Sequence, residues 1–279
     1  MVLRRALGFL AILLLATCRE ADAPPPPEVA TAPLVLHDEA ELEAYLADFP
    51  ADQYRVYEVP GVGRFHIDDP NERIKKVIVE GRKWEEHIIE VLEEYVRPGS
   101  VALDVGAHIG THTLTLSRLV GPSGRVYAFE PVKKTYRELR RNLALNGVTN
   151  VVPLRYAIGS GPASVIEMNP IHPGEEGGTS VGHGGDRAEL RSLDSFGFEQ
   201  VSLIKIDVEG FELPVLDGAE DTIRRNRPVL IVEIMGGYDY ETAPPEARLQ
   251  IDVTRWRIAG LGYKVERVKK QDYLALPED

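Results

Sequence analysis

The chain has 279 residues, enough for one large domain or two small ones with a sizeable buried core. It carries 32 Lys and Arg against 44 Asp and Glu, and the resulting net charge of −12 excludes a broad basic face for nucleic acid or anionic lipid. Hydrophobic residues make up 43% of the chain, which excludes disorder over most of it. Because Cys18 is the single cysteine, an intramolecular disulfide and a cysteine-based zinc site are excluded as well.

The first residues are typical of a targeting segment followed by a tether. Arg4 and Arg5 precede an apolar run over 6–17, which has the length of a signal-peptide core and is too short for an ordinary membrane-spanning helix. We expect residues 1–23 to form a signal peptide or membrane anchor and the proline-rich residues 24–33 to form a linker. The expected location is bacterial, either exported or membrane-anchored, with a cytoplasm-facing anchor as the alternative.

Two processing sites remain open at the end of this segment. The sequence around Cys18, Leu-Ala-Thr-Cys, resembles a bacterial lipobox, in which the cysteine is lipidated, although Thr17 stands where Gly, Ala or Ser is usual. Ala21-Asp22-Ala23 is instead a site for ordinary signal peptidase.

The folded region is expected to begin near Leu34, with residues 34–97 as an N-terminal cap. Within this cap the pattern predicts an exposed acidic helix, three short strands and a second helix. In chain order these are 38–48 for the helix, 54–59, 64–67 and 74–79 for the strands, and 84–96 for the second helix.

From residue 98 to the end, strands and helices alternate. Apolar runs predict strands over 101–105, 125–129, 151–158, 201–208 and 229–234. Helical spacing predicts helices over 111–120, 131–146, 213–225 and 245–259, the last with Leu249, Val253, Trp256 and Gly260 on one face. A final antiparallel pair is expected over 263–268 and 272–276. This alternation predicts an α/β fold, a mostly parallel sheet with helices on both faces, whose ligands bind beyond the carboxyl ends of the strands.

The first strand of this region ends in the pattern D-x-G-x-x-x-G, from Asp104 through Gly106 to Gly110. The glycines permit a tight turn with close approach of a ligand, and the helix that follows directs backbone N–H groups at an anionic group. Asp104 can accept a hydrogen bond from an ammonium group, so a ligand with both a carboxylate and an ammonium suits this turn. A glycine turn required only for packing is the alternative.

The second strand ends at Glu130, 20 residues after Gly110. A carboxylate at this place can accept hydrogen bonds from both hydroxyls of a ribose. The alternative is an acidic residue that is stabilised by the dipole at the start of a helix. The two spacings together are more specific than either one alone.

Charged residues lie at the ends of two later strands. Lys205, Asp207 and Glu209 alternate and are expected to share one face, and Glu233 is expected beside the same cleft. Charges at such places are costly unless they pair or face a cleft. All four are therefore candidate catalytic residues, with ion pairing as the alternative. Ion pairing explains them as well as a divalent metal on the three carboxylates does, and no metal is expected.

Four motifs in this order resemble the FkbM family of S-adenosylmethionine-dependent methyltransferases. They are Asp104 to Gly110, Ala128 to Pro131, Ser192 to Ser195 and Ile204 to Gly210. The resemblance runs from about Gly81 to Ile234, and residues 81–85 are similar to the family's lead-in to the first strand. It implies a class I methyltransferase domain over 98–279, Rossmann-like, with a seven-stranded sheet and a C-terminal antiparallel hairpin.

The resemblance also implies S-adenosylmethionine as the cofactor. Glu130 would take the ribose hydroxyls, and Ala157 with Ile158 would flank the adenine. The residues implied at the methionine end are Asp104, Gly106, Ala107 and Gly110, with His108 standing where the family has Asn.

Members of the family are mostly O-methyltransferases that act on hydroxyls, so the expected function is O-methylation of a hydroxyl on a small molecule or glycan. The candidate bases are Asp207, Glu209 and Glu233, oriented by Lys205. His172 and His183 are further candidates, in the glycine-rich residues 169–187, which are expected to form a mobile loop over the substrate.

Two other functions stay open. A domain outside the cytoplasm lacks access to the cytoplasmic cofactor pool, which favours a non-enzymatic exported binding lipoprotein on the same scaffold. A nucleotide-dependent oxidoreductase is the other alternative, and the absence of G-x-G-x-x-G counts against it. The sequence does not decide the oligomeric state.

Overall fold

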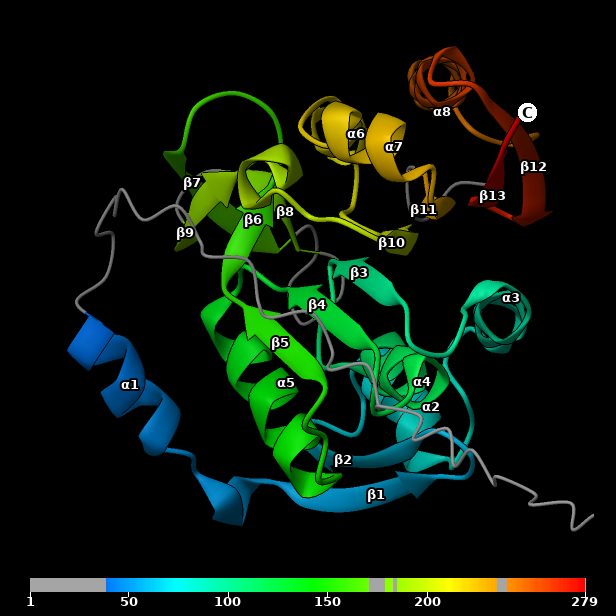
Figure 1. Ribbon diagram of the computed structural model, residues 1–279. Helices are drawn as coiled ribbons and strands as arrows, with labels where there is room; N and C mark the ends of the chain where they lie inside the picture. Colours follow the sequence, from blue (N-terminus) through cyan, green and yellow to red (C-terminus); the bar gives the residue numbers. More distant parts are fainter. Residues whose placement is uncertain (1–38, 171–178, 183–184, 235–239, 279) are drawn as a thin grey trace, which may run out of the picture.

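The computed structural model describes residues 39–170, 179–182, 185–234 and 240–278, and its centre is a seven-stranded sheet (Figure 1). The strand order is β12-β13-β11-β10-β3-β4-β5. Neighbouring strands run parallel except at β13, which is antiparallel to both β11 and β12. The strands are β3 (Val101–Val105), β4 (Arg125–Phe129), β5 (Val151–Leu154), β10 (Val201–Ile206), β11 (Val229–Glu233), β12 (Tyr263–Lys269) and β13 (Asp272–Pro277). The expected mostly parallel sheet with a terminal hairpin is confirmed.

Helices cover both faces of this sheet. One face carries α3 (Glu86–Tyr95), α4 (Thr111–Val120) and α5 (Lys133–Leu145), and the other carries η2 (Leu193–Phe196), α6 (Glu212–Asp217), α7 (Glu220–Asn226) and α8 (Pro245–Gly260). Alternation along β3 shows why. Ala102 packs with Leu92 of α3 and Leu116 of α4, whereas Leu103 packs with Val215 and Ile223 on the opposite side.

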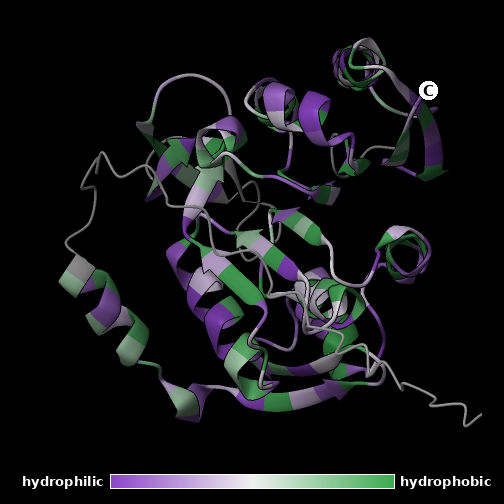
Figure 2. Cartoon of the chain, in the orientation of Figure 1, coloured by the Kyte–Doolittle hydropathy of each residue, from purple (hydrophilic) through white to green (hydrophobic). Residues whose placement is uncertain are grey.

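The hydropathy of the chain follows this layering. In Figure 2 the strands β3 to β5 carry green, hydrophobic residues, whereas α5, α7 and β12 carry many purple, hydrophilic ones. A strand buried on both faces must be apolar throughout, while a covering helix needs only one apolar stripe. In α5 this stripe includes Tyr136, Leu139 and Leu143, as the periodicity predicts.

The N-terminal cap packs against α5. It contains α1 (Glu39–Ala47), η1 (Ala51–Gln53), β1 (Arg55–Val59), β2 (Gly63–Ile67) and α2 (Arg73–Val79). The antiparallel pair of β1 and β2 places Phe65 and Ile67 in one hydrophobic cluster with Leu139 and Leu143 of α5.

The strand predicted over 74–79 is wrong, because these residues form helix α2. The carboxylate of Glu72 accepts hydrogen bonds from the N–H groups of Ile74 and Lys75 and thereby starts the helix. The β-branched residues favoured a strand, but Ile78 is buried at helical spacing from Ile74. Tertiary packing thus overrides local strand propensity here.

A second, four-stranded sheet of order β6-β9-β7-β8 adjoins the end of β5 and was not predicted (Figure 1). Its strands are β6 (Tyr156–Ile158), β7 (Ser164–Pro170), β8 (Thr179–Gly182) and β9 (Asp186–Arg191). The strand predicted over 151–158 is divided at Arg155 between the two sheets. The loop predicted over 169–187 contains β8 and the start of β9, while His172 and His183 lie outside the described residues.

Two helix predictions also need correction. The helix predicted over 213–225 is two helices, α6 and α7, separated at Gly218, where a Cβ would lie 1.9 Å from the carbonyl oxygen of Gly159. In α8 the predicted apolar face points outward, with Trp256 68% and Leu249 60% exposed. The buried residues of α8 are Ala247, Ile251, Thr254 and Ile258.

Within the described ranges, no helix has both the length and the hydropathy needed to cross a bilayer. The predicted targeting segment, with Cys18, lies outside these ranges.

Candidate functional site

A cleft of about 980 Å³, part of it open to solvent, lies at the carboxyl ends of β3, β4 and β10. The chain leaves β3 for β4 and β5 on one side of the sheet and returns to β10 on the other, so the strand order reverses between β3 and β10. Such a switch point is where ligands bind in open α/β sheets. The second sheet and the residues just before α3 supply further walls of the cleft.

The turn that follows β3 requires glycine. Gly106 has a φ of +85°, and a Cβ there would lie 1.7 Å from the carbonyl oxygen of Asp207. The N–H groups of Gly106 and Ala107 both donate to the carbonyl of Phe129, at 3.0 and 2.9 Å. Gly110, with a φ of +95°, caps the start of α4. The ends of β4 and β10 therefore hold this turn between them.

Asp104 lies beneath the turn and is fully buried. Its Oδ2 accepts a hydrogen bond of 2.6 Å from Thr113 Oγ1. Its Oδ1 accepts none within the described residues and lies 4.0 Å from Lys205 Nζ. Burial raises the pKa of Asp104, while Lys205 and Thr113 oppose that rise. Its carboxylate therefore supports the turn from inside the fold and does not line the cleft.

Glu130, at the end of β4, joins two parts of the site. Its carboxylate accepts hydrogen bonds from the N–H of His108, the N–H of Val132 and the hydroxyl of Thr135, at 2.9, 2.9 and 2.8 Å. Burial raises the pKa of Glu130 to about 7, against the effect of these three donors. The side chain lines the cleft, and its two oxygens retain capacity for further hydrogen bonds.

An apolar wall borders the same part of the cleft. It is formed by Phe129, Ala157 and Ile158 together with Met168 of the second sheet and Phe211 before α6. Such a wall suits a flat, weakly polar group, because aromatic and aliphatic side chains bury its faces.

Charged groups meet at the end of β10. Lys205 Nζ lies 2.9 Å from Asp207 Oδ2 and is almost fully buried. Burial opposes both charges, yet the ion pair raises the pKa of Lys205 and lowers that of Asp207. The strand ends at Ile206, so the predicted alternation does not extend to Glu209, which has a φ of +49° in the following turn. Asp207 and Glu209 both line the cleft.

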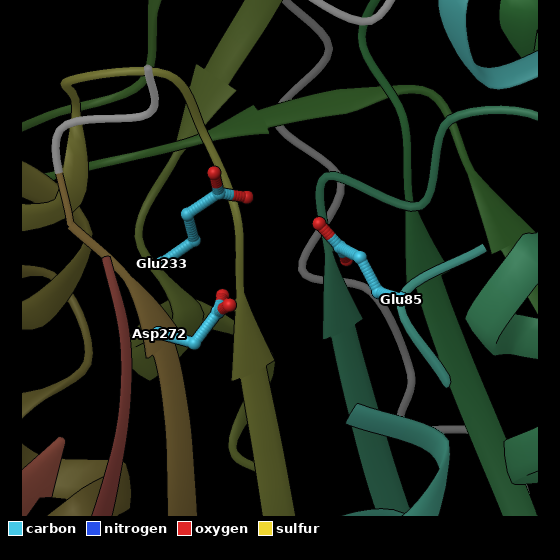
Figure 3. Close-up of side chains that lie close together, drawn as sticks. All are labelled: Glu85, Glu233 and Asp272. Carbon is cyan, nitrogen blue, oxygen red and sulfur yellow. The ribbon is translucent and has the colours of Figure 1, made fainter. Parts of the chain in front are cut away.

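Three more carboxylates lie beside this pair. Glu233 and Asp272 reach in from the ends of β11 and β13, and Glu85 reaches in from the other side (Figure 3). One oxygen of each lies within 4.8 Å of the others. Asp272 Oδ2 is 2.6 Å from His87 Nε2, and Glu233 Oε1 accepts a hydrogen bond of 2.9 Å from Gln271.

Crowding of these carboxylates changes their protonation. Burial and the charge of Asp207 raise the pKa of Glu85 to about 8 and that of Glu233 to about 10. Burial raises the pKa of Asp272 as well, although His87 opposes the rise. Strongly perturbed carboxyl groups in a cleft are typical of functional sites.

The structure brings most of the sequence-predicted site residues to this one cleft. Those that line it are Gly106, His108, Glu130, Ala157, Asp207, Glu209 and Glu233. The others are buried and are not part of the lining, and these are Asp104, Ala107, Gly110 and Lys205.

Sequence reasoning missed the contribution of the N-terminal cap and of the last strand. Arg73, Trp84 and Glu85 line the cleft, with the Arg73 guanidinium 5.3 Å above the Trp84 ring. Glu85 belongs to residues 81–85, which resemble the family's lead-in to the first strand, so the sequence did contain a signal for this residue. Asp272 had no local signal, because only the register of β11 and β13 places it opposite Glu233.

The fold and the cleft together define a class I, S-adenosylmethionine-dependent methyltransferase: a seven-stranded sheet with one reversed strand, a glycine turn after its first strand and an acidic residue after its second. A family model described as "Methyltransferase FkbM domain" matches residues 104–265, more than half of the chain. The chain therefore belongs to the FkbM methyltransferase family, and its cofactor is S-adenosylmethionine.

The chain is similar to named methyltransferases and to one solved structure. The chain is 31% identical to the hexuronic acid methyltransferase AglP of Haloferax volcanii over 182 residues, which cover 62% of this chain and 73% of AglP. It is 28% identical to Methyltransferase 1 of Beauveria bassiana over 148 residues, 44% of this chain and 59% of that protein. The solved structure of methyltransferase FkbM from Methylobacillus flagellatus aligns with a TM-score of 0.44 and 19% identity, covering 67% of this chain and 50% of that one.

Proposed function

We propose that this methyltransferase transfers the methyl group to a hydroxyl oxygen of a small molecule or sugar. One observation carries the proposal: a single cleft joins the glycine turn and Glu130 to an ion-paired carboxylate, Asp207. The named function of AglP, a hexuronic acid methyltransferase, supports a sugar as acceptor.

The residues of the first half of the cleft fit the cofactor. Glu130 retains acceptor capacity for ribose hydroxyls, and Ala157 and Phe211 offer apolar surface to an adenine. Gly106 has no side chain at the closest approach of two strand ends, which leaves the backbone open to the ligand. Asp104 acts as a positioning residue, because its carboxylate is buried against Thr113 and Lys205.

The cofactor, when bound, supplies an activated methyl group on a sulfonium. The chain must then position the acceptor and take up its proton. Asp207 is placed for this, since it lines the cleft while Lys205 holds its carboxylate from behind. Glu209 and Glu233 line the same cleft and remain alternatives for the base.

The charge of the acceptor end favours a neutral hydroxyl over a carboxylate. An ionised carboxylate would enter beside Asp207, which the ion pair with Lys205 keeps ionised, and beside Glu209, and like charges repel. Among the described residues that line the cleft, Arg73 is the one lysine or arginine. We therefore expect neutral hexosides to be better acceptors than free hexuronic acids.

The test is release of S-adenosylhomocysteine from the purified protein with a panel of matched hexosides and hexuronides. Asp207→Asn should lower kcat about 10²- to 10⁴-fold while the affinity for S-adenosylhomocysteine is kept. Glu93→Gln, on the exposed surface of α3, is the control. A preference for hexuronides would overturn the proposed neutral acceptor. A normal kcat in Asp207→Asn would overturn Asp207 as the base.

We also propose that residues 1–33 export or anchor the enzyme, on the strength of the apolar run before Cys18 and the proline-rich stretch after it. A fusion of alkaline phosphatase after residue 33 tests which side the domain faces. Phosphatase activity supports export, and its absence in an expressed fusion supports a cytoplasm-facing domain.

A further inference from the structure

Three carboxylates from distant parts of the chain converge beside the cleft. Glu85 precedes α3, Glu233 ends β11 and Asp272 begins β13, and Figure 3 shows their side chains reaching toward a common space. One oxygen of each lies within 4.8 Å of the others. Glu233 and Asp272 are direct partners in the antiparallel register, an arrangement that is unfavourable for two like charges.

Basic groups nearby do not neutralise this cluster. The ammonium of Lys205 is 2.9 Å from Asp207, and no lysine or arginine of the described residues lies within 4.0 Å of the three carboxylates. Among the described residues, His87 is the one side-chain partner of the Asp272 carboxylate. The carboxyl group of Glu85 receives no hydrogen bond from any described residue, although this side chain is only 15% exposed. The three carboxyl groups are therefore left beside the cleft without a cationic side chain to pair with.

A buried imidazole lies beside one member of this group, Glu85. His112, in the first turn of α4, is 3% exposed, and its Nε2 makes no hydrogen bond to any described residue. This nitrogen lies 3.7 Å from Oε2 of Glu85, too far for a hydrogen bond. A buried imidazole nitrogen that has no hydrogen-bond partner and lies beside carboxylates is a ligand pattern for a metal ion.

The spacing also fits a metal ion. Oxygens on opposite sides of Mg²⁺ are separated by about 4.2 Å, and those around Ca²⁺ by about 5 Å, as twice their bond lengths. The three oxygens lie no more than 4.8 Å apart, so an adjustment of about 0.6 Å at most brings each pair within the span of Mg²⁺. We propose that Glu85, Glu233 and Asp272, with His112 beside Glu85, bind one divalent cation of the Mg²⁺ or Mn²⁺ type. Carboxylates select hard divalent cations, and the imidazole favours Mn²⁺ among them.

His87 fits this assignment as the group that orients a ligand. Its hydrogen bond to Asp272 resembles the carboxylate–histidine contacts that fix ligands around metal sites. Because Glu85 and Glu233 line the cleft, the cation has an open side toward the acceptor. At that place a bound cation would lower the pKa of a coordinated acceptor hydroxyl. This role rests on the proposed function, whereas the binding of the cation is independent of it.

The test is titration of the full-length, EDTA-treated protein with Mn²⁺, with free Mn²⁺ measured by electron paramagnetic resonance. We expect one Mn²⁺ per chain, displaced by Mg²⁺. Glu85→Gln and Asp272→Asn should each weaken the affinity by at least about tenfold. The matched control Glu93→Gln, an exposed carboxylate paired with Arg118, should bind as the wild type does.

Melting curves separate loss of the site from loss of the fold. Because Glu85→Gln keeps the shape of a side chain that has no lysine or arginine partner, it should leave the melting temperature of the metal-free protein unchanged or higher. Mn²⁺ should raise the melting temperature of the wild type and of Glu93→Gln, and should not raise that of Glu85→Gln. The inference is overturned if the wild type does not bind Mn²⁺ stoichiometrically, or if Glu85→Gln and Asp272→Asn both bind Mn²⁺ with the affinity of the wild type.

Methyl transfer measured on the same samples keeps the two proposals apart. Cation binding without methyl transfer to any hydroxyl would support the cation site and overturn the proposed function. Methyl transfer by a protein that binds no cation would support the function and overturn the cation site.

Discussion

Replacement of Gly106 by alanine should damage both the stability and the cofactor site. The added Cβ would lie 1.7 Å from the Asp207 carbonyl oxygen, whereas contacts under 3.0 Å are essentially never seen, so the two strand ends must separate by at least about 1.3 Å. The left-handed φ of +85° adds about 1–2 kcal/mol of strain, and overpacking adds about 1–3 kcal/mol. We expect the free energy of unfolding to fall by about 2–5 kcal/mol.

Gly121→Ala is the matched control. Gly121 also has a left-handed φ, +68°, but no atom lies within 4 Å of the position that a Cβ would take. Because its ψ of −174° places it in a region that only glycine populates readily, backbone strain of about 1–3 kcal/mol without overpacking is then expected. Urea denaturation measures both losses, and isothermal titration should show at least about tenfold weaker S-adenosylhomocysteine binding in Gly106→Ala alone. Equal losses of stability in the two variants would refute the steric argument, and unchanged cofactor affinity in Gly106→Ala would refute the site.

Three further changes test other parts of the fold by urea denaturation. Lys205→Met leaves its two aspartate partners buried without their cation and should lower the free energy of unfolding by about 3–5 kcal/mol. Lys264→Met, in an exposed pair, should change nothing measurable, and a Lys205→Met protein as stable as the wild type would contradict the buried pair. Burial opposes ionisation of Asp68, but two lysines lower its pKa, so its contribution is present above the unfolded pKa of about 4 and is lost as the pH falls through the folded pKa. Asp68→Asn should therefore be less stable than the wild type at pH 7, with a difference that shrinks in acid; a difference independent of pH would exclude this linkage. Trp256→Ser should change the free energy of unfolding by less than about 0.5 kcal/mol, and Ile258→Ala should lower it by about 2–5 kcal/mol; the reverse order would mean that α8 packs through its other face.

Local patterns were sufficient for the parts of the fold next to the proposed cofactor site. The bounds predicted for β3, β4 and α4 match the structure residue for residue. Strands buried on both faces are continuous apolar runs, and glycine or proline ends each element, so the signals are strong and local. The glycine turn and Glu130 follow directly from these elements, and both lie at the cleft.

Patterns that depend on distant partners were not readable in the same way. The β-branched residues of α2 resemble a strand until Glu72 caps them as a helix. The apolar side of α8 that contains Trp256 is exposed, because the sheet contacts the side with Ile251 and Ile258. Which face is buried depends on the neighbour and not on hydropathy alone.

The sequence by itself determined the order of strands and helices, the glycine turn and the family, because each is encoded within a few consecutive residues. The tertiary structure decided the group of carboxylates beside the cleft. Glu85, Glu233 and Asp272 are separated by more than a hundred residues at their widest, and the strand order together with the antiparallel register of β13 brings them within 4.8 Å. Chain entropy disfavours such distant contacts unless the packed sheet enforces them, so a group of charges like this one is specified by the whole fold.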